Sequence, residues 1–536
     1  MPLRLIQGLI LYFSLISILS AQNLDIGLIN RTASADDGLT LFSPLQSTYT
    51  FLIDVDGRIV NEWKSDHVPG ASSYLHTDGS MFRAGRLEAP AFIFGGGGAG
   101  GIIEQFDWNG ELLWQFVYSD RNVRQHHDIE ILPNGNVLIA AWESIPINEV
   151  IAAGRNPTFL GNQFLSEQLI EVKPNGPDGG EIVWRWRVWD HIIQDFDPNL
   201  QNFGDVSENP GLIDINYGDA PRGDWVHINS IDYHPEKDQI LLSSFGQNEI
   251  WIIDHSTTIN EAAGSTGGRY GQGGNLLFRW GNPLAHQNGS PDLRYFYDQH
   301  DAKWITDGSN KDGIIVFVNG NNRPDGDYSS VLALNPIENN SQNYLMDETG
   351  VYLPELPFLE FTADPNESFY SSFVSGADLL KNGNLLICNG SVGTFFEVDE
   401  TGQSVWEYIN PIGKDILITN PDSGENQVFK INRYSSDFEG FRGKILAPRR
   451  DLTETFGQDL DEVLIYPNPA SDYLIVEGDF ETLADVNFYN EAGYPALADL
   501  ALYSEKVIAL SFNQVPNGVY FLKIGKKDAY RVIVNR

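Results

Sequence analysis

The sequence predicts an all-β protein: a six-bladed β-propeller followed by a small C-terminal β-sandwich. The chain has 52 Gly, 27 Pro and 12 Trp among its 536 residues, which favours short strands and turns over helices. One sequence pattern recurs along most of the chain: an apolar strand, an Asp/Asn/Gly turn and a second strand that ends in Trp. The length also exceeds what one core can organise, so more than one domain is expected.

The N-terminal residues 1–21 are predicted to be a secretory signal peptide. Arg4 precedes an apolar run from Leu5 to Leu19, and the small residues Ser20 and Ala21 follow it. The run is interrupted by polar residues and is too short to span a membrane, and no later stretch reaches spanning length. We therefore expect a protein that is exported and whose mature chain has no transmembrane segment.

Residues 22–450 are predicted to form the propeller. The Trp-terminated sequence pattern occurs at residues 51–63, 103–114, 169–184 and 395–406. A second sequence pattern, at residues 129–139, recurs at residues 377–387. Asn-Gly and Asp-Gly between alternating strands are strong hairpin signals. About 430 residues at roughly 45 to 70 per blade give about six blades. Long insertions are expected to shape the mouth of the site, at residues 195–224, 256–275 and 337–366.

A polar, acidic linker at residues 451–462 is predicted to separate the propeller from the C-terminal residues 463–536. Alternating apolar positions between turn residues indicate a small β-sandwich there. The motifs YPNPASDYLIVEG, FYNEAG and VPNGVYFLKI resemble the C-terminal sorting domain of the type IX secretion system of Bacteroidetes. This resemblance implies passage through the inner and outer membranes, with the secretion machinery as partner, and then release or attachment at the cell surface. An adhesive or carbohydrate-binding sandwich is the alternative.

The charge balance excludes several classes of partner. There are 34 Lys+Arg against 73 Asp+Glu, a net charge of −39, so a nucleic-acid partner or an anionic membrane surface is not expected. The single cysteine, Cys388, excludes an intramolecular disulfide and a cysteine-based zinc site. No nucleophile elbow, phosphate-binding loop or dinucleotide fingerprint occurs. The glycine run at Gly95–Gly101 lacks the Lys-Ser/Thr of a phosphate loop and is interpreted as a flexible turn between blades.

Histidines at the starts of three apolar strands are the candidate functional residues. They lie in Gln-His126-His127-Asp, in Asp-Trp-Val-His227-Ile-Asn229 and in Gln-His300-Asp. Strand alternation places His227 and Asn229 on one face. If the three strands are innermost in their blades, their imidazoles converge in the central channel. Such a cluster could ligate zinc with one position open, or supply a nucleophile and acid/base groups for transfer chemistry.

The remaining histidines are expected at surface positions in turns or insertions, namely His67, His76, His191, His234, His255 and His286.

Over roughly residues 40–445 the chain resembles the arylsulfotransferases that use no nucleotide sulfate donor. The resemblance rests on HHDIEILPNGNVLI, DWVHINSIDYHPEKDQILLSS, QHDAKW with IVFVNGNNRP, and SGADLLKNGNLLICNG. It implies a six-bladed propeller that transfers a sulfuryl group from a phenolic sulfate ester to a phenolic acceptor through a sulfated histidine. No cofactor or metal is expected, and the partners are a small aryl sulfate and a phenol.

By the same resemblance His300 matches the histidine that becomes sulfated, and His227 matches a second active-site histidine. The third comes from His126 or His127; the spacing leaves both open, and His127 beside Asp128 is preferred. A general acid/base would assist the phenol oxygens, and cationic or hydrogen-bonding groups would hold the sulfuryl oxygens.

The chain departs from the family pattern at two points. Where the family has Ser-Ser-Arg, this chain has Ser-Ser-Phe245, so the bidentate grip of that arginine on the sulfuryl oxygens is lost. The family disulfide is also absent. Arg323 is the nearest candidate replacement for the arginine, provided that it points inward. Two other functions therefore remain open: a metal-dependent propeller lyase or hydrolase, and a non-catalytic ligand-binding propeller.

Overall fold

The computed structural model describes residues 26–88, 96–218, 223–418, 420–449, 451–455, 463–477, 486–496, 498–503, 507–524 and 529–536. The predicted signal peptide at residues 1–21 lies outside the described residues, as does most of the predicted linker.

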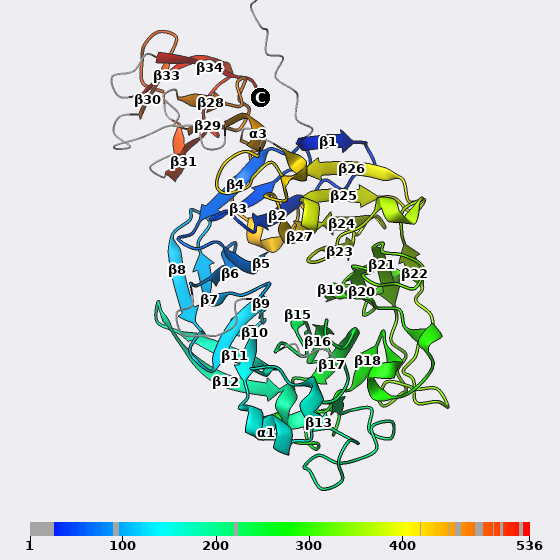
Figure 1. Ribbon diagram of the computed structural model, residues 1–536. Helices are drawn as coiled ribbons and strands as arrows, with labels where there is room; N and C mark the ends of the chain where they lie inside the picture. The colour runs from blue at the N-terminus through cyan, green and yellow to red at the C-terminus, as the bar shows by residue number, and fades with distance from the viewer. Residues whose placement is uncertain are drawn as a thin grey trace, which may run out of the picture.

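In the described part of the chain, six blades surround a central channel as a β-propeller, which confirms the predicted fold (Figure 1). Two of the blades, β5–β8 and β9–β12, are joined into one eight-stranded sheet by a short pairing of β5 with β9. Their innermost strands are β5 (Pro69–Leu75), β9 (Val123–Ile131), β15 (Ile228–His234), β19 (Gln299–Trp304), β23 (Gly376–Leu379) and β27 (Val428–Tyr434). Outside them lie β6 (Met81–Arg86), β7 (Gly101–Phe106), β8 (Leu112–Val117), β10 (Val137–Ser144), β11 (Leu165–Asn175), β12 (Gly179–Arg187), β16 (Gln239–Ser244), β17 (Glu249–Asp254), β18 (Phe278–Trp280), β20 (Ile314–Val318), β21 (Ser330–Leu334), β22 (Leu359–Phe361), β24 (Leu385–Asn389), β25 (Thr394–Val398) and β26 (Ser404–Ile409). The insertions carry α1 (Ile147–Ala152), α2 (Ile259–Ala262) and the parallel pair β13 (Ile192–Ile193) and β14 (Ile213–Asp214).

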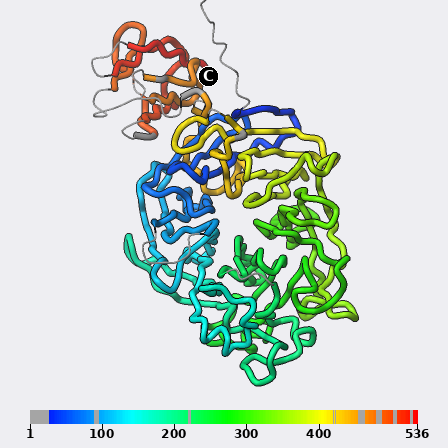
Figure 2. Tube along the Cα trace, in the orientation of Figure 1, coloured from blue at the N-terminus to red at the C-terminus, as the bar shows by residue number. Residues whose placement is uncertain are grey.

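The ring is closed by strands from distant parts of the chain. Strand β27 pairs with β2 (Leu39–Pro44), which continues through β3 (Tyr49–Ile53) to β4 (Ile59–Lys64). Strand β1 (Gly27–Arg31) pairs with β26 on the outer edge of the preceding blade. The blue and orange-yellow ends of the propeller therefore lie side by side in the trace (Figure 2).

The recurring tryptophan joins several blades to the next one along the ring. The indole of Trp63 on β4 donates to the carbonyl oxygen of Asp107 at 2.8 Å, that of Trp114 on β8 to Gly179 at 2.8 Å, and that of Trp406 on β26 to Val55 at 2.8 Å. Each acceptor belongs to the following blade, so a buried indole fills the space between two sheets and also satisfies a backbone carbonyl. This double role explains why Trp recurs at a fixed place in the repeat.

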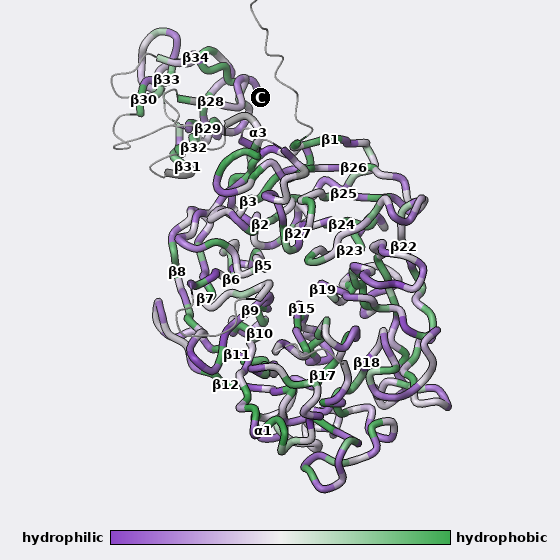
Figure 3. Tube along the Cα trace, in the orientation of Figure 1, coloured by the Kyte–Doolittle hydropathy of each residue, from purple (hydrophilic) through white to green (hydrophobic). Residues whose placement is uncertain are grey.

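Hydrophobic and hydrophilic segments are mixed along the blades (Figure 3), and central strands such as β16 and β17 are buried along their whole length, as expected for sheets that pack against a neighbouring blade on each face. The C-terminal residues form the predicted sandwich, whose two sheets share a core that includes Leu474, Phe488 and Leu522. Its strands are β28 (Leu464–Tyr466), β29 (Tyr473–Glu477), β30 (Val486–Asn490), β31 (Asp499–Tyr503), β32 (Val507–Ser511), β33 (Gly518–Ile524) and β34 (Ala529–Val534), preceded by α3 (Leu452–Thr455).

The expectation of surface positions for the six remaining histidines is wrong for three of them. His191, His234 and His286 are buried, with exposed fractions of 1%, 5% and 2%. They are tolerated in the interior because polar groups lie beside them: for example, Nε2 of His234 lies 3.0 Å from a carboxylate oxygen of Asp312.

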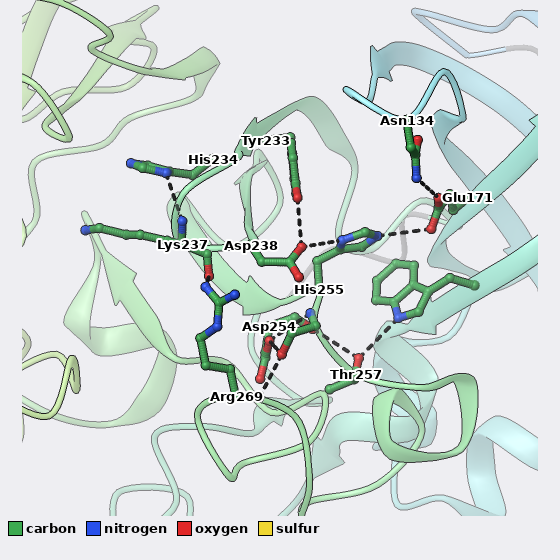
Figure 4. Close-up of polar contacts among 12 residues, drawn as sticks. Asn134, Glu171, Tyr233, His234, Lys237, Asp238, Asp254, His255, Thr257 and Arg269 are labelled. Carbon is green, nitrogen blue, oxygen red and sulfur yellow. Dashed lines mark hydrogen bonds and ion pairs between the residues drawn. The ribbon is translucent and has the colours of Figure 1, made fainter.

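His255 links two blades through two carboxylates (Figure 4). Its Nδ1 lies 2.8 Å from Asp238 in the same blade, and its Nε2 lies 3.2 Å from Glu171 on β11 of the preceding blade. Although burial alone would lower it, the pKa of His255 is raised to about 9 by these two carboxylates. The imidazolium therefore bridges the blades at neutral pH.

Replacing His255 with Gln is expected to destabilise the protein by about 1–3 kcal/mol at pH 6. Because the folded pKa of His255 exceeds the ordinary value of 6.5, its contribution is fully present below pH 6.5 and is lost as the pH rises through about 9. Urea unfolding at pH 6 and at pH 10 measures this. The difference between wild type and variant should shrink at the higher pH, and an equal difference at both pH values would contradict the assignment.

Candidate active site

One mouth of the central channel opens into a cavity of about 820 Å³. It is lined by residues from the innermost strands and the loops before them, and from turns between other strands, such as the turn between β16 and β17. Among these residues are His127, His227, His300, Phe245 and Phe429. The structure thus brings the three histidines from separate blades to one cavity.

A local distortion of the inner strands accompanies each histidine. Pairing with the neighbouring strand shifts register beside His127, beside His227 and just after His300. His127 and His227 have φ of 50° and 54°, and Asp301 has φ of 54°. Such bulges redirect side chains, and a left-handed conformation at a non-glycine residue is a strained feature that clusters at functional sites.

Three imidazoles and two phenyl rings surround the cavity, with His127 and His227 next to each other. The ring centroids of His127 and His227 lie 4.6 Å apart. Phe245 stands between His227 and His300, with its centroid 5.3 Å from the first and 5.5 Å from the second. Phe429 lies on the other side, 5.6 Å from His127 and 6.3 Å from His300. An aromatic ligand entering the cavity would meet both imidazoles and phenyl faces.

The orientation of His300 follows from Asn319 at the end of β20. The amide nitrogen of Asn319 donates to the carbonyl oxygens of Ser371 and Val374, at 2.7 and 3.0 Å. Its Oδ1 therefore faces Nδ1 of His300, 2.6 Å away. Since an amide oxygen only accepts, Nδ1 of His300 carries the proton, and the lone pair of the neutral ring lies on Nε2.

His227 and Asp224 form a second oriented pair. Nδ1 of His227 contacts a carboxylate oxygen of Asp224, whose other oxygen accepts a hydrogen bond from the indole of Trp142 at 3.1 Å. Burial would raise the pKa of Asp224, but the facing His227 lowers it below its usual value. The carboxylate thus fixes the ring of His227 and stabilises a positive charge on it.

Burial keeps the other two imidazoles neutral. Desolvation lowers the pKa of His300 to about 4, against the opposing hydrogen bond to Asn319. Desolvation and the neighbouring His227 lower the pKa of His127 well below its usual range. At neutral pH His300 is therefore uncharged, with its lone pair on Nε2.

The profile of the arylsulfotransferase (ASST) family matches residues 29–433, which is nearly the whole propeller. The chain belongs to the arylsulfotransferase family. The profile of a secretion system C-terminal sorting domain matches residues 464–535, which places this arylsulfotransferase-family protein at the cell surface or outside the cell. No helix in the described part of the chain is both long and apolar enough to cross a membrane.

No curated protein matches the chain. Among solved structures, a protein of unknown function from Bacteroides caccae is 13% identical, with a TM-score of 0.39, and covers 74% of this chain and 99% of its own. A catalytically inactive virginiamycin B lyase from Staphylococcus aureus, solved with quinupristin, is 10% identical, with a TM-score of 0.33. The match covers 73% of this chain and 90% of the lyase. The β-propeller domain of Cps50 from Myceliophteria thermophila is 9% identical, with a TM-score of 0.36, and the match covers 77% of this chain and 97% of that domain.

Three residues selected from the sequence lie outside the cavity lining. His126 is fully buried behind His127, where its ring stacks on Trp142 with centroids 4.1 Å apart. The amide of Asn229 donates to the carbonyl oxygen of Gln299 and so ties β15 to β19. Arg323 donates to the hydroxyl of Ser330, and its guanidinium lies 4.4 Å from the ring centroid of Tyr328. None of these contacts directs the guanidinium of Arg323 to the histidines.

Two arginines other than Arg323 bring positive charge to the cavity. Arg86 and Arg155 are among the lining residues. Arg86 is exposed, whereas Arg155 is buried and donates to the carbonyl oxygens of Ile215 and Gly218. Burial lowers the pKa of Arg155 to about 10, which leaves it charged at neutral pH. Of the three predicted mouth-shaping insertions, the first contributes to the lining, through Tyr217 and Gly218.

Sequence reasoning missed several groups that shape the site. Asp224 stands three residues before His227, and this spacing is the sequence signal that could have identified it as the partner of that imidazole. Asn319 follows the apolar strand after His300. The described part of the glycine run pairs with β9 rather than forming a free turn: the backbone amide of His127 donates to the carbonyl oxygen of Gly98 at 2.7 Å. A Cβ at Gly98 would lie 2.2 Å from Nε2 of His127, so only glycine fits there.

No group of three or more His, Cys, Asp or Glu side chains suited to a metal ion is found among the residues that the structure describes.

Proposed function

We propose that this protein transfers a sulfuryl group from a phenolic sulfate ester to a phenolic acceptor, with His300 as the nucleophile that is transiently sulfated. The observation that supports the proposal best is the hydrogen bond between Nδ1 of His300 and Asn319, which leaves the lone pair on Nε2. His300 lines the cavity, and the chain belongs to the arylsulfotransferase family. His227 and His127 serve as acid/base groups.

In the first half-reaction, Nε2 of His300 attacks the sulfur in line, and the bond between sulfur and the phenolic oxygen breaks. The departing phenolate takes a proton from a neighbouring histidine. In the second, the acceptor phenol gives its proton to that histidine and its oxygen attacks sulfur, and the N–S electron pair returns to His300. General acid/base assistance of this kind contributes about 10²–10⁴-fold in rate.

The aromatic side chains suit the substrate class. Phe245 and Phe429 flank His300, so an aryl ring can stack beside the nucleophile while its sulfate group reaches Nε2. Because Phe245 replaces the family arginine, the sulfuryl oxygens depend on other donors, and Arg86 and Arg155 are the lining cations. They also supply the local positive charge that a protein of net charge −39 needs to attract an anion.

The test is the turnover of 4-nitrophenyl sulfate by the purified protein with and without added phenol. We expect nitrophenol release that phenol accelerates, with the parallel-line kinetics of a ping-pong reaction. Turnover that disappears after chelation and returns with a divalent metal would instead indicate the metal-dependent lyase or hydrolase.

The loss of the arginine at Phe245 favours a second function, a non-catalytic propeller that binds aryl sulfates. This function predicts saturable binding of 4-nitrophenyl sulfate by calorimetry without its consumption.

Replacing Phe245 with Arg is expected to raise kcat/KM for 4-nitrophenyl sulfate by about 10-fold, because a charge-assisted bidentate contact would hold the sulfuryl oxygens between His227 and His300. Steady-state kinetics measure this. Phe245→Lys, which lacks the planar fork, should gain less. A decrease in kcat/KM with the fold intact would contradict this expectation and would show that stacking of the substrate on the phenyl ring matters more than a grip on the sulfuryl oxygens.

A further inference from the structure

A chain of hydrogen bonds leads from the cavity into the protein interior behind His127. Nδ1 of His127 lies 2.8 Å from Nδ1 of His126, and Nε2 of His126 lies 2.7 Å from Oε2 of Glu167 on β11. His126 and Glu167 are completely buried. Since Nδ1 of His127 is occupied in this way, Nε2 is the nitrogen that it can offer to a ligand in the cavity.

Neighbouring groups hold the three side chains in place. The ring of His126 lies against Trp142 with an interplanar angle of 12°, and Trp142 pairs with Glu167 across β10 and β11. The second carboxyl oxygen of Glu167, Oε1, accepts from the backbone amide of Ile228 at 3.1 Å. The carboxyl group can therefore present only Oε2 to His126.

Two proton arrangements satisfy this chain, because one of two facing nitrogens must donate and the other accept. When Glu167 is ionised, Nε2 of His126 donates to it, Nδ1 of His126 accepts from His127, and Nε2 of His127 is a bare acceptor. When Glu167 is protonated, every hydrogen bond reverses and Nε2 of His127 becomes a donor. The proton on Glu167 thus sets the role of His127 in the cavity.

We propose that Glu167 and His126 are positioning residues that form a proton relay, through which His127 alternates between general acid and general base. This inference rests on the proposed function. As the donor ester is cleaved, Nε2 of His127 gives its proton to the departing phenolate, His126 passes one proton to Nδ1 of His127, and Glu167 passes its proton to His126. The acceptor phenol returns a proton along the same path, so the cycle closes without an external proton.

The charges around the relay agree with this cycle. Burial, reinforced by Asp224, raises the pKa of Glu167 well above its usual value, so the carboxyl group can hold a proton. Burial lowers the pKa of His126 to about 3, which keeps it a neutral shuttle. The other charged or titratable groups that act on the two histidines include Asp224, His227, Arg124, Asp128, His300 and Lys430.

Replacing Glu167 with Gln tests the relay sharply. The amide of Ile228 requires an acceptor, so the Gln oxygen turns to it and the Gln NH₂ donates to His126. Every bond is then fixed in one direction, and Nε2 of His127 is locked as a donor. In protein labelled with ¹⁵N-histidine, the His127 Nε2 resonance, assigned by its loss in His127→Asn, should switch tautomer with pH in wild type and remain protonated in E167Q.

Kinetics supply a second readout. With 4-nitrophenyl sulfate, whose leaving group is a weak base and depends little on proton donation in the cleavage step, E167Q should keep the first burst of nitrophenol within about threefold of wild type. Transfer to phenol should fall by about 10²-fold or more, because the relay can no longer take the acceptor's proton. Glu171→Gln on the same strand, which removes a carboxylate that bonds His255 instead, should change neither the tautomer of His127 nor transfer to phenol.

An E167Q protein whose His127 tautomer still switches with pH, or whose transfer to phenol is unchanged, would overturn the relay. His126→Phe, which retains a ring against Trp142 but cannot move a proton, should give the same loss of transfer if E167Q does not fold. Absence of turnover in wild type would contradict the proposed function alone, since the tautomer measurement still decides whether Glu167 controls His127.

Discussion

His300→Ala is expected to lower aryl-sulfate turnover by at least about 10³-fold, because no other group replaces the nucleophile and the two-step path is lost. The side chain is buried at the cavity wall and hydrogen-bonded to Asn319 through Nδ1, so the alanine variant loses both the attacking lone pair and its alignment. Initial rates with 4-nitrophenyl sulfate and phenol measure the effect.

His191→Gln is the matched control for this variant. His191 is equally buried, but its ring contacts Asn275 and the carbonyl oxygen of Ala262. Its replacement should change turnover less than about threefold even where it reduces stability. If His300→Ala retained wild-type turnover, His300 would not be the nucleophile.

Lys430→Met is expected to destabilise the propeller by about 3–5 kcal/mol, the largest effect on stability that we anticipate. The ammonium of Lys430 on β27 lies 2.9 Å from Asp128 on β9 and 2.9 Å from Asp301 on β19, and all three side chains are buried. The two carboxylates raise its pKa despite burial. Methionine fills much of the same volume but leaves Asp128 without a cation, so chemical denaturation should show a much lower midpoint.

Lys311→Met serves as the comparison, since its ion pair with Glu236 is largely exposed and surface pairs contribute about 0–1 kcal/mol. Equal losses in the two variants would mean that the central ion cluster adds no more than a surface pair.

The propeller could be predicted because its signals are local. The hairpin turns and the recurring tryptophans are visible within a dozen residues, and the length of the repeating region gives the approximate number of blades. The convergence of His127, His227 and His300 also follows from a local signal, their position at the starts of inner strands, once those strands surround one channel.

The rest of the site depends on contacts between distant segments, which one sequence does not reveal. Glu167 approaches His126 because β11 and β9 flank β10, and nothing in its own segment marks it. Asn319 is oriented by carbonyl groups more than fifty residues away in sequence. Arg323 illustrates the converse: a nearby motif made it a candidate for the missing arginine, whereas its guanidinium packs on Tyr328 instead.

The most direct test of the central claim is mass spectrometry of the protein after rapid mixing with 4-nitrophenyl sulfate in the absence of an acceptor. The account predicts one added sulfuryl group on the peptide that contains His300, which disappears when phenol is added and never forms in His300→Ala. Release of nitrophenol by a protein that carries no sulfuryl group, or carries it on another residue, would contradict the account.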